Sequence, residues 1–232
     1  MARNISYGIC EKCGHRTTKG HMLRHIRKCF QTETKQDGSD YQLFQLRIEA
    51  EYLPMYWLDI EMNADQKLRD LDNFLREIWL ECCGHMSQFQ INDHHYVMPY
   101  DSSYQIWTYE SGMDIRLSDS IRDDIDQFEY EYDFGTTTAL KIRLIEKRTG
   151  KKNKKGVRLL ARNEPPDWRC AKCDQPATDI CVFCLYESGD AFCKKHKDGH
   201  GCDEEYFLPV VNSPRTGECG YVGPGENIDF WE

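Results

Sequence analysis

The pattern of apolar and polar positions is most regular in the middle of the chain. Residues Tyr41–Ala50 alternate well enough for a strand, and Met55–Met62 predicts a second strand after a turn at Pro54. Apolar side chains then recur at helical spacing from Leu68 to Trp79, and Gly84 ends this helix. The chain therefore begins its central part with two strands followed by one long amphipathic helix.

Further strands and a short helical turn are predicted after that helix. The strands are at Ser87–Ile91, Tyr104–Thr108, Gln127–Asp133 and Ala139–Lys147, the helical turn is at Leu117–Ile121, and Phe207–Val211 favours one more strand. One main helix among several strands predicts an α+β domain with a mostly antiparallel sheet.

The charge is acidic on average but unevenly distributed. A net charge of −9 and a pI near 5.4 argue against a general nucleic-acid binder. Residues 1–35 nevertheless hold eight Lys and Arg against two acids, residues 141–158 hold nine against one, and residues 41–133 hold six against twenty. Within the second basic region, the run KRTGKKNKKGVR at 147–158 fits two roles equally. It is a flexible hairpin or linker, or a contact for nucleic acid or an acidic partner.

The cellular compartment affects how the cysteines are interpreted. No apolar run reaches membrane-spanning length, and no signal-peptide core follows Met1, so we expect a cytoplasmic protein without membrane association. Twelve cysteines in such a compartment favour metal binding over disulfides.

The strongest chemical signal is a cysteine-rich array between Cys170 and Cys202. Its eight Cys and His residues fall into four close pairs, and a two-residue gap lets a tight turn aim two donors at one zinc ion. Four pairs predict two ions in a cross-braced arrangement. The first set is Cys170, Cys173, Cys193 and His196, and the second set is Cys181, Cys184, His200 and Cys202. The array resembles the B-box and related cross-braced zinc modules, and the resemblance implies a small fold around metal that serves as a protein-interaction platform.

A second metal signal lies near the N-terminus. Cys10 and Cys13 form a knuckle, and His25 and Cys29 lie one helical turn apart, so both point the same way from a helix. This pattern resembles a zinc finger with cysteine as its last ligand. His21 is an alternative ligand to His25, but it would leave too short a loop after Cys13 and would leave Cys29 without a metal. His15 is expected to be exposed in the loop after the knuckle.

The predicted finger is basic, which leaves its role open between two interpretations. Its positive residues are Arg16, Lys19, Arg24, Arg27 and Lys28. They would contact phosphates, or they would form an ordinary solvated helix face. Because the acidic centre repels a duplex, a finger that binds DNA must project away from it on the polar linker at 31–40, and a single finger reads only about three base pairs.

The central part of the chain resembles the plasmid pRiA4b ORF-3-like family. The residues that carry this resemblance are Tyr41-Gln42-Leu43, the turn at Pro54 with Trp57, the helix Leu71–Leu80 running into Gly84-His85, Phe89, the segment 115–119, and Tyr130-Glu131-Tyr132-Asp133-Phe134-Gly135. The resemblance implies an α+β fold and no established activity; such proteins occur on plasmids, near transposons and on chromosomes.

The chain departs from the family pattern at several polar positions. Leu58 and Asp59 stand where an arginine pair is usual, Met86 and Ser87 where a second histidine is usual, and three threonines follow Gly135 in place of acids, Trp and His. If those polar residues form a site in relatives, this chain has lost much of it, which argues against catalysis in the central domain.

Two other motifs give weaker signals for chemistry. Asp133-Phe134-Gly135 lacks the other motifs of a kinase and predicts a tight turn at a strand end. The alternating acids Glu129, Glu131 and Asp133 either form a solvated face or hold a metal for hydrolysis.

The remaining cysteines are not assigned to zinc. Cys82 and Cys83 lie near His85, His94 and His95, so a further zinc site is one interpretation, but the spacing lacks a knuckle and packing as small apolar residues is favoured. Cys219 has no knuckle partner and is not counted as a ligand.

These observations predict a chain of six parts and three zinc ions. The parts are a zinc finger at 1–32, a linker at 33–40, the α+β domain at 41–149, a basic linker at 150–166, the two-zinc module at 167–206 and a C-terminal tail at 207–232. The function they favour is a non-catalytic zinc-binding scaffold, associated with nucleic acid or regulation and linked to mobile elements. The alternatives are a protein-interaction adaptor without nucleic-acid binding and a metal-assisted hydrolase that uses the acidic strand.

Overall fold

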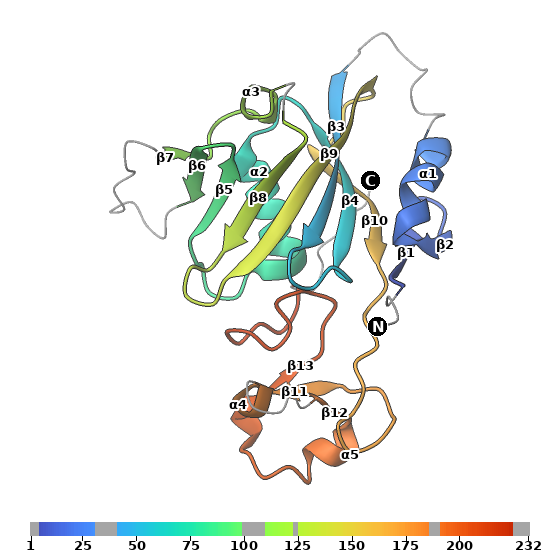
Figure 1. Ribbon diagram of the computed structural model, residues 1–232, viewed down its shortest axis with the longest axis vertical. Coiled ribbons are helices and arrows are strands. Elements are labelled where there is room, and N and C mark those ends of the chain that lie inside the picture. The colour runs from blue at the N-terminus through green and yellow to red at the C-terminus, as the bar shows by residue number, and fades with distance from the viewer. Residues whose placement is uncertain (1–4, 31–40, 99–109, 123–124, 186–190, 225–232) are drawn as a thin grey trace.

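The computed structural model describes residues 5–30, 41–98, 110–122, 125–185 and 191–224. A ten-stranded sheet forms the main body, and a separate three-stranded sheet lies below it (Figure 1). The predicted α+β class with a mostly antiparallel sheet is confirmed. No helix in these ranges is long and apolar enough to span a membrane.

The large sheet contains most of the strands. In chain order they are β1 (Tyr7–Cys10), β2 (Arg16–Thr18), β3 (Tyr41–Ala50), β4 (Trp57–Asn63), β5 (Ser87–Ile91), β6 (His94–Met98), β7 (Glu110–Gly112), β8 (Gln127–Tyr132), β9 (Thr138–Gly150) and β10 (Val157–Asn163). Their spatial order is β2-β1-β10-β4-β3-β9-β8-β5-β6-β7. Neighbours pair antiparallel except for β6 and β7, which pair in parallel. The predicted strand at Tyr104–Thr108 lies outside the described residues.

The main helix packs its apolar side on one face of this sheet. It consists of α2 (Leu68–Leu75), which continues into the π-helix η2 (Arg76–Leu80), and the short α3 (Leu117–Ser120) follows later. Leu71 and Trp79 of the helix are fully buried with Leu58 and Ile60 of β4 in the largest hydrophobic cluster. Because side chains alternate along a strand, Trp57 and Asp59 point to the opposite face.

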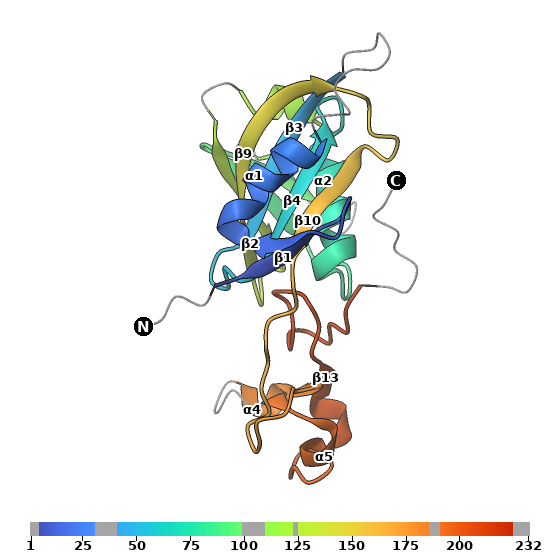
Figure 2. The ribbon, with the colours of Figure 1, turned by 90° about the vertical axis from the view of Figure 1, so that its right-hand side faces the viewer.

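The opposite face is covered by the N-terminal module, residues 5–30. Its helix α1 (Lys19–Phe30) buries Met22, Ile26 and Phe30, spaced one turn apart, against Trp57 and Leu160 (Figure 2). Strand β1 of the module pairs with β10, so the module extends the large sheet. The module therefore does not project away from the acidic domain, as DNA binding by this module would require.

The expected basic linker at 150–166 contains a strand. Residues Val157–Asn163 form β10, which lies between β1 and β4. Leu159 and Leu160 are buried in different clusters because neighbouring side chains of a strand point to opposite faces. Leu160 and Ala161 share one cluster, because the pairing with β4 shifts register between Leu159 and Ala161. That irregularity, together with the lysines before it, hides the strand from a search for strict alternation.

Some of the opposite charges that are segregated along the sequence pair with one another in the fold. On the face covered by α1, the carboxylate of Glu49 accepts hydrogen bonds from Lys19 at 2.7 Å and from Arg143 at 2.6 Å. Arg148 likewise pairs with the buried Glu61. The basic ends of the chain thus bind its acidic centre, and these pairs weaken the case for an external acidic partner of the basic run.

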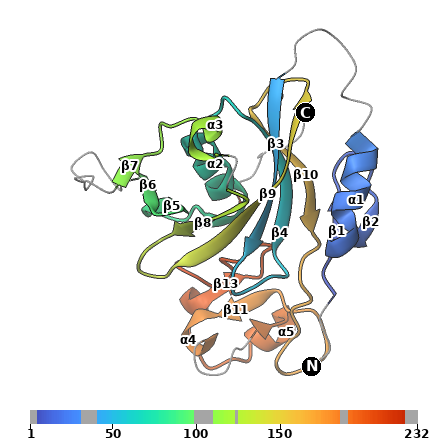
Figure 3. The same ribbon diagram turned by 45° about the horizontal axis from the view of Figure 1, so that its top comes forward.

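The C-terminal module, residues 167–209, has its own small sheet. Its elements are β11 (Asp179–Cys181), α4 (Val182–Leu185), β12 (Ala191–Phe192), α5 (Lys194–Lys197), the 3-10 helix η3 (Glu204–Tyr206) and β13 (Phe207–Pro209). The order β12-β11-β13 is antiparallel, and the module lies below the strands of the large sheet in Figures 1 and 3.

Residues 210–221, the docking segment, return from this module to the central domain. Ser213 Oγ donates a hydrogen bond to the carbonyl oxygen of Trp79 at 2.6 Å, and Arg215 is fully buried. A Cβ added at Gly217 would lie 3.0 Å from Leu185 of the module. The segment expected to be a free tail therefore packs against both bodies.

Candidate metal centres

The N-terminal module brings four of the predicted ligands together. Strand β1 ends at Cys10, a turn with Gly14 at φ +69° follows Cys13, and α1 presents His25 and Cys29. The four donor atoms all lie within 4.8 Å of one another, and Cys13 Sγ is 3.3 Å from His25 Nε2.

The other two histidines of this module lie outside the group. His15 is exposed, and its ring stacks on that of His25 at a centroid distance of 4.4 Å. His21 is exposed one turn before His25, so the structure groups His25 with the three cysteines.

The C-terminal module brings its eight predicted ligands together as two groups. Cys170, Cys173, Cys193 and His196 form one, with His196 Nδ1 3.3 Å from Cys170 Sγ and 3.5 Å from Cys193 Sγ. The second group is Cys181, Cys184, His200 and Cys202, in which Cys184 Sγ lies 3.7 Å from Cys202 Sγ and 3.3 Å from His200 Nε2. The groups alternate along the chain, which is the cross-braced pairing that the spacing predicts.

These distances fit zinc. Four donors about 2.3 Å from one ion at the corners of a tetrahedron lie about 3.8 Å apart, and a histidine nitrogen shortens its edges slightly. Each group offers three thiols and one imidazole, so the protein would fill all four positions. Fully protein-ligated zinc is typical of structural sites, whereas catalytic zinc keeps a position for water.

Crowding of the thiols affects their ionisation. Burial raises the pKa of Cys10 to about 12, and burial with the neighbouring Cys202 and Cys181 raises the pKa of Cys184 to about 12. For Cys170 burial acts in the same direction, but hydrogen bonds from backbone N–H groups, including that of Cys193, outweigh it and lower the pKa to about 6. A divalent cation would stabilise all the thiolates and release the remaining protons.

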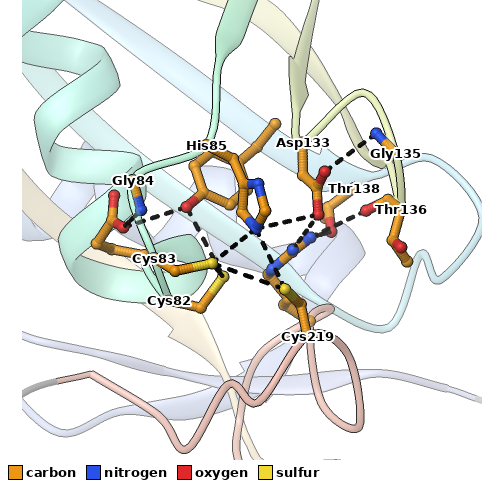
Figure 4. Close-up of polar contacts among 12 residues, drawn as sticks. Cys82, Cys83, Gly84, His85, Asp133, Gly135, Thr136, Thr138 and Cys219 are labelled. Atoms are coloured by element: carbon orange, nitrogen blue, oxygen red, sulfur yellow. Dashed lines mark hydrogen bonds and ion pairs between the residues drawn. The ribbon is translucent and has the colours of Figure 1, made fainter. Parts of the chain in front are cut away.

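A fourth group lies where the sequence predicted none. Cys82, Cys83, His85 and Cys219 have donor atoms within 4.8 Å of one another (Figure 4). Cys83 and Cys219 are exposed and Cys82 is half-buried, so the expectation that Cys82 and Cys83 simply pack in the core is wrong for Cys83. The spacing gave no knuckle because Cys219 comes from the docking segment, far along the chain from the other three.

The carboxylates of the acidic strand do not gather into a group within the described residues. Glu129 is exposed, and Glu131 Oε2 accepts a hydrogen bond from Gln88 at 2.6 Å. Asp133 turns away at φ +64°, and its Oδ2 accepts a hydrogen bond from Arg215 Nη2 at 2.5 Å. Burial tends to raise the pKa of Asp133, but the guanidinium and two backbone N–H groups hold it below its usual value. The geometry thus gives no support to hydrolysis by these acids.

Fold and sites define an α+β protein that carries closed Cys/His groups outside its main helix–sheet core. The chain belongs to the plasmid pRiA4b ORF-3-like protein family, whose model matches residues 42–168. The match includes β10, beyond the predicted domain boundary at 149, because β10 pairs directly with β4 of the central sheet.

Comparison with other proteins adds little about function. A search of curated proteins found no match. Among solved structures, the chain is similar to the crystal structure of a protein of unknown function from Methanosarcina mazei Go1, at 16% identity and a TM-score of 0.45. The similarity covers 53% of this chain and 70% of the other.

Proposed function

We propose that this protein is a non-catalytic zinc-binding scaffold, in which the two flanking modules hold macromolecular partners around the family domain. The observation that carries the proposal is the donor set of the predicted groups, three thiols and one imidazole each. Such closed sets stabilise small modules and leave no open coordination position for a substrate. The plasmid in the family description supports a link to mobile elements.

The C-terminal module is the better candidate for a protein partner. Phe183 in α4 is 60% exposed, and its ring lies 5.5 Å from that of Tyr206. Exposed aromatic side chains on a rigid surface are typical of protein interfaces. This role agrees with the resemblance of the array to B-box-like interaction modules.

Nucleic-acid binding is the second candidate, and it depends on the exposed part of α1. Arg24 and Lys28 line a shallow depression of about 250 Å³ together with His15 and His21. Three of the six basic residues of this module are paired with acids: Arg16 with Glu164, Lys19 with Glu49, and Arg27 with Glu146. The phosphate-binding surface is therefore smaller than the sequence suggests.

Elemental analysis of protein purified in reducing buffer without chelator tests the scaffold proposal. We expect at least three zinc ions per chain, one for each predicted group. Protein that is folded and contains fewer than three zinc ions would overturn the proposal. Other transition metals in place of zinc would retain the architecture but refute the metal assignment.

A titration with labelled duplex DNA at two salt concentrations separates the two partner classes. If α1 contacts phosphates, the double variant Arg24→Ala and Lys28→Ala should weaken binding and flatten the salt slope by about two units. The matched control is Lys194→Ala with Lys195→Ala, which removes the same charge from the exposed α5. Undetectable binding by the wild type at low salt favours the protein adaptor.

A further inference from the structure

We propose that Cys82, Cys83, His85 and Cys219 form a fourth zinc site, which fixes the docking segment to the central domain. The site lies outside both flanking modules, so the geometry that supports it is independent of theirs. Three thiols and one imidazole converge here, the same composition as in the three predicted groups.

The distances between the donor atoms fit the edges of a zinc tetrahedron. Cys83 Sγ lies 3.7 Å from both Cys82 Sγ and Cys219 Sγ, close to the edge of about 3.8 Å expected between two zinc-bound sulfurs. His85 Nε2 lies 2.9 Å from Cys83 Sγ and 3.2 Å from Cys219 Sγ. The predicted groups show separations of 3.3 to 3.9 Å, so the sulfur–sulfur distances here match them and the two distances to His85 are shorter.

The backbone on both sides of the site is shaped to present these atoms. After the π-helix η2 ends at Leu80, the chain turns at Gly84, whose φ is +75° and whose N–H donates to Glu81 Oε1. Cys219 has a φ of +46°, a left-handed conformation that is uncommon for a residue with a side chain. A bond from its sulfur to a metal would compensate for that unfavourable conformation.

The same contacts argue against a catalytic cysteine. Cys83 Sγ, Cys219 Sγ and, at 3.4 Å, Asp133 Oδ2 all approach the Nε2 atom of His85. A nucleophile–base–acid relay needs the thiol and the carboxylate on different ring nitrogens. Convergence of several donors on one point is instead the arrangement that a metal ion requires.

Neighbouring polar groups support the cluster. Tyr132 Oη lies 3.8 Å from Cys82 Sγ, and the buried guanidinium of Arg215 interacts electrostatically with Cys82. Arg215 in turn holds Asp133 and donates to the carbonyl oxygen of Thr136 at 3.0 Å. Such outer contacts orient metal ligands, and a positive charge beside three thiolates offsets the net negative charge of the zinc complex.

A metal here would link parts of the chain that are distant in sequence. Cys82, Cys83 and His85 follow the main helix of the central domain, whereas Cys219 follows the C-terminal module. The docking segment between that module and Cys219 already contacts Trp79 and Leu185. Zinc would thus fix the position of the C-terminal module relative to the large sheet.

The experiment counts zinc in full-length variants by native mass spectrometry under reducing conditions. We expect four zinc ions in the wild type and three in each of Cys83→Ser and Cys219→Ser. The double variant should also contain three, because both residues bind the same ion. Cys184→Ser combined with Cys219→Ser should contain two, because those residues belong to different sites. His85→Cys should retain four, since thiolate can replace imidazole.

The outcomes distinguish this site from the three predicted ones. A wild type with three zinc ions that keeps them in Cys219→Ser, while Cys184→Ser loses one, would overturn the fourth site and leave the proposed function intact. A Cys83–Cys219 disulfide in protein with three zinc ions would overturn it as well. If a serine variant fails to fold, the count in His85→Cys and in His85→Ala decides, with four and three ions expected.

Discussion

The N-terminal and C-terminal modules use the same donor set but are attached to the family domain in different ways. The N-terminal module continues the large sheet through β1 and shares a hydrophobic cluster with Trp57 and Leu160. The C-terminal module forms its own sheet and reaches the central domain at its two ends. At those ends Trp168 Nε1 donates to Tyr56 Oη at 3.2 Å, and Ser213 bonds Trp79. A metal in the first module would stabilise part of the sheet, whereas metals in the second would stabilise a separate body.

The largest expected effect comes from removing one ligand in each module. Structural zinc contributes an apparent free energy of roughly 10–16 kcal/mol in finger peptides near neutral pH, so Cys184→Ser should unfold the C-terminal module. Because that module has its own sheet, hydrogen exchange should rise across 170–206 and stay slow in β3 and β4. Cys29→Ser should instead raise exchange in β1 and β10 as well as in α1. If hydrogen exchange rises over the same residues in both variants, the two modules are not attached to the domain in different ways.

The second prediction tests the attachment through the docking segment. Arg215→Met leaves the buried Asp133 without its partner, which should cost about 3 kcal/mol of unfolding free energy. Adding Asp133→Asn should recover part of this loss, since the uncompensated charge disappears. Urea unfolding of both variants measures the effect, and additive losses in the double variant would mean that the two side chains do not interact.

A third prediction tests the contact between the N-terminal module and the sheet. A Cβ on Gly8 would lie 2.4 Å from both the Trp57 ring and the carbonyl oxygen of Arg162, so Gly8→Val should destabilise the protein by about 1–3 kcal/mol. Gly20 in α1 is the matched control, because nothing lies within 4 Å of its Cβ position. Gly20→Ala should stabilise by about 0.5–1 kcal/mol through helix propensity. Loss of stability in Gly20→Ala, or none in Gly8→Val, would contradict this packing.

The smallest effect concerns the charges between this module and β3. Burial raises the pKa of Glu49, but Lys19 and Arg143 outweigh it and hold the pKa below its ordinary value. Its contribution to stability is therefore present above the unfolded-state pKa and is lost as the pH falls through the lower folded-state value. Glu49→Gln should lose up to about 1 kcal/mol at pH 7 and show a flatter decline in acid. Thermal melts from pH 7 to pH 3 compare Glu49→Gln with the wild type. Parallel curves of stability against pH would refute the pairing of Glu49 with Lys19 and Arg143.

The elements that could be predicted from the sequence are those with a local, regular signal. Strand β5 and the helix from Leu68 have uninterrupted periodicity, and the resemblance at Trp57 and Tyr130–Gly135 identified the family correctly. The Cys/His groups of the two modules could also be predicted from the sequence, because their knuckles place the residues of each pair close together in the chain. Strand β10 was missed because a bulge interrupts its alternation.

Contacts between distant segments left no local signal. Cys219 meets Cys83 and His85 because the chain returns to the central domain after the C-terminal module. The pairing of Glu49 with Lys19 and Arg143 likewise depends on the register of β3 with β9 and on the position of α1. Composition showed that opposite charges were segregated along the chain, but only the fold shows that they neutralise one another.

The central claim is that this family member is held together by zinc. The most direct test is the zinc content of the intact chain, measured by native mass spectrometry after purification in reducing buffer without chelator. The account predicts four zinc ions per chain, three in the flanking modules and one at Cys82, Cys83, His85 and Cys219. Folded protein with fewer than three bound zinc ions would contradict it.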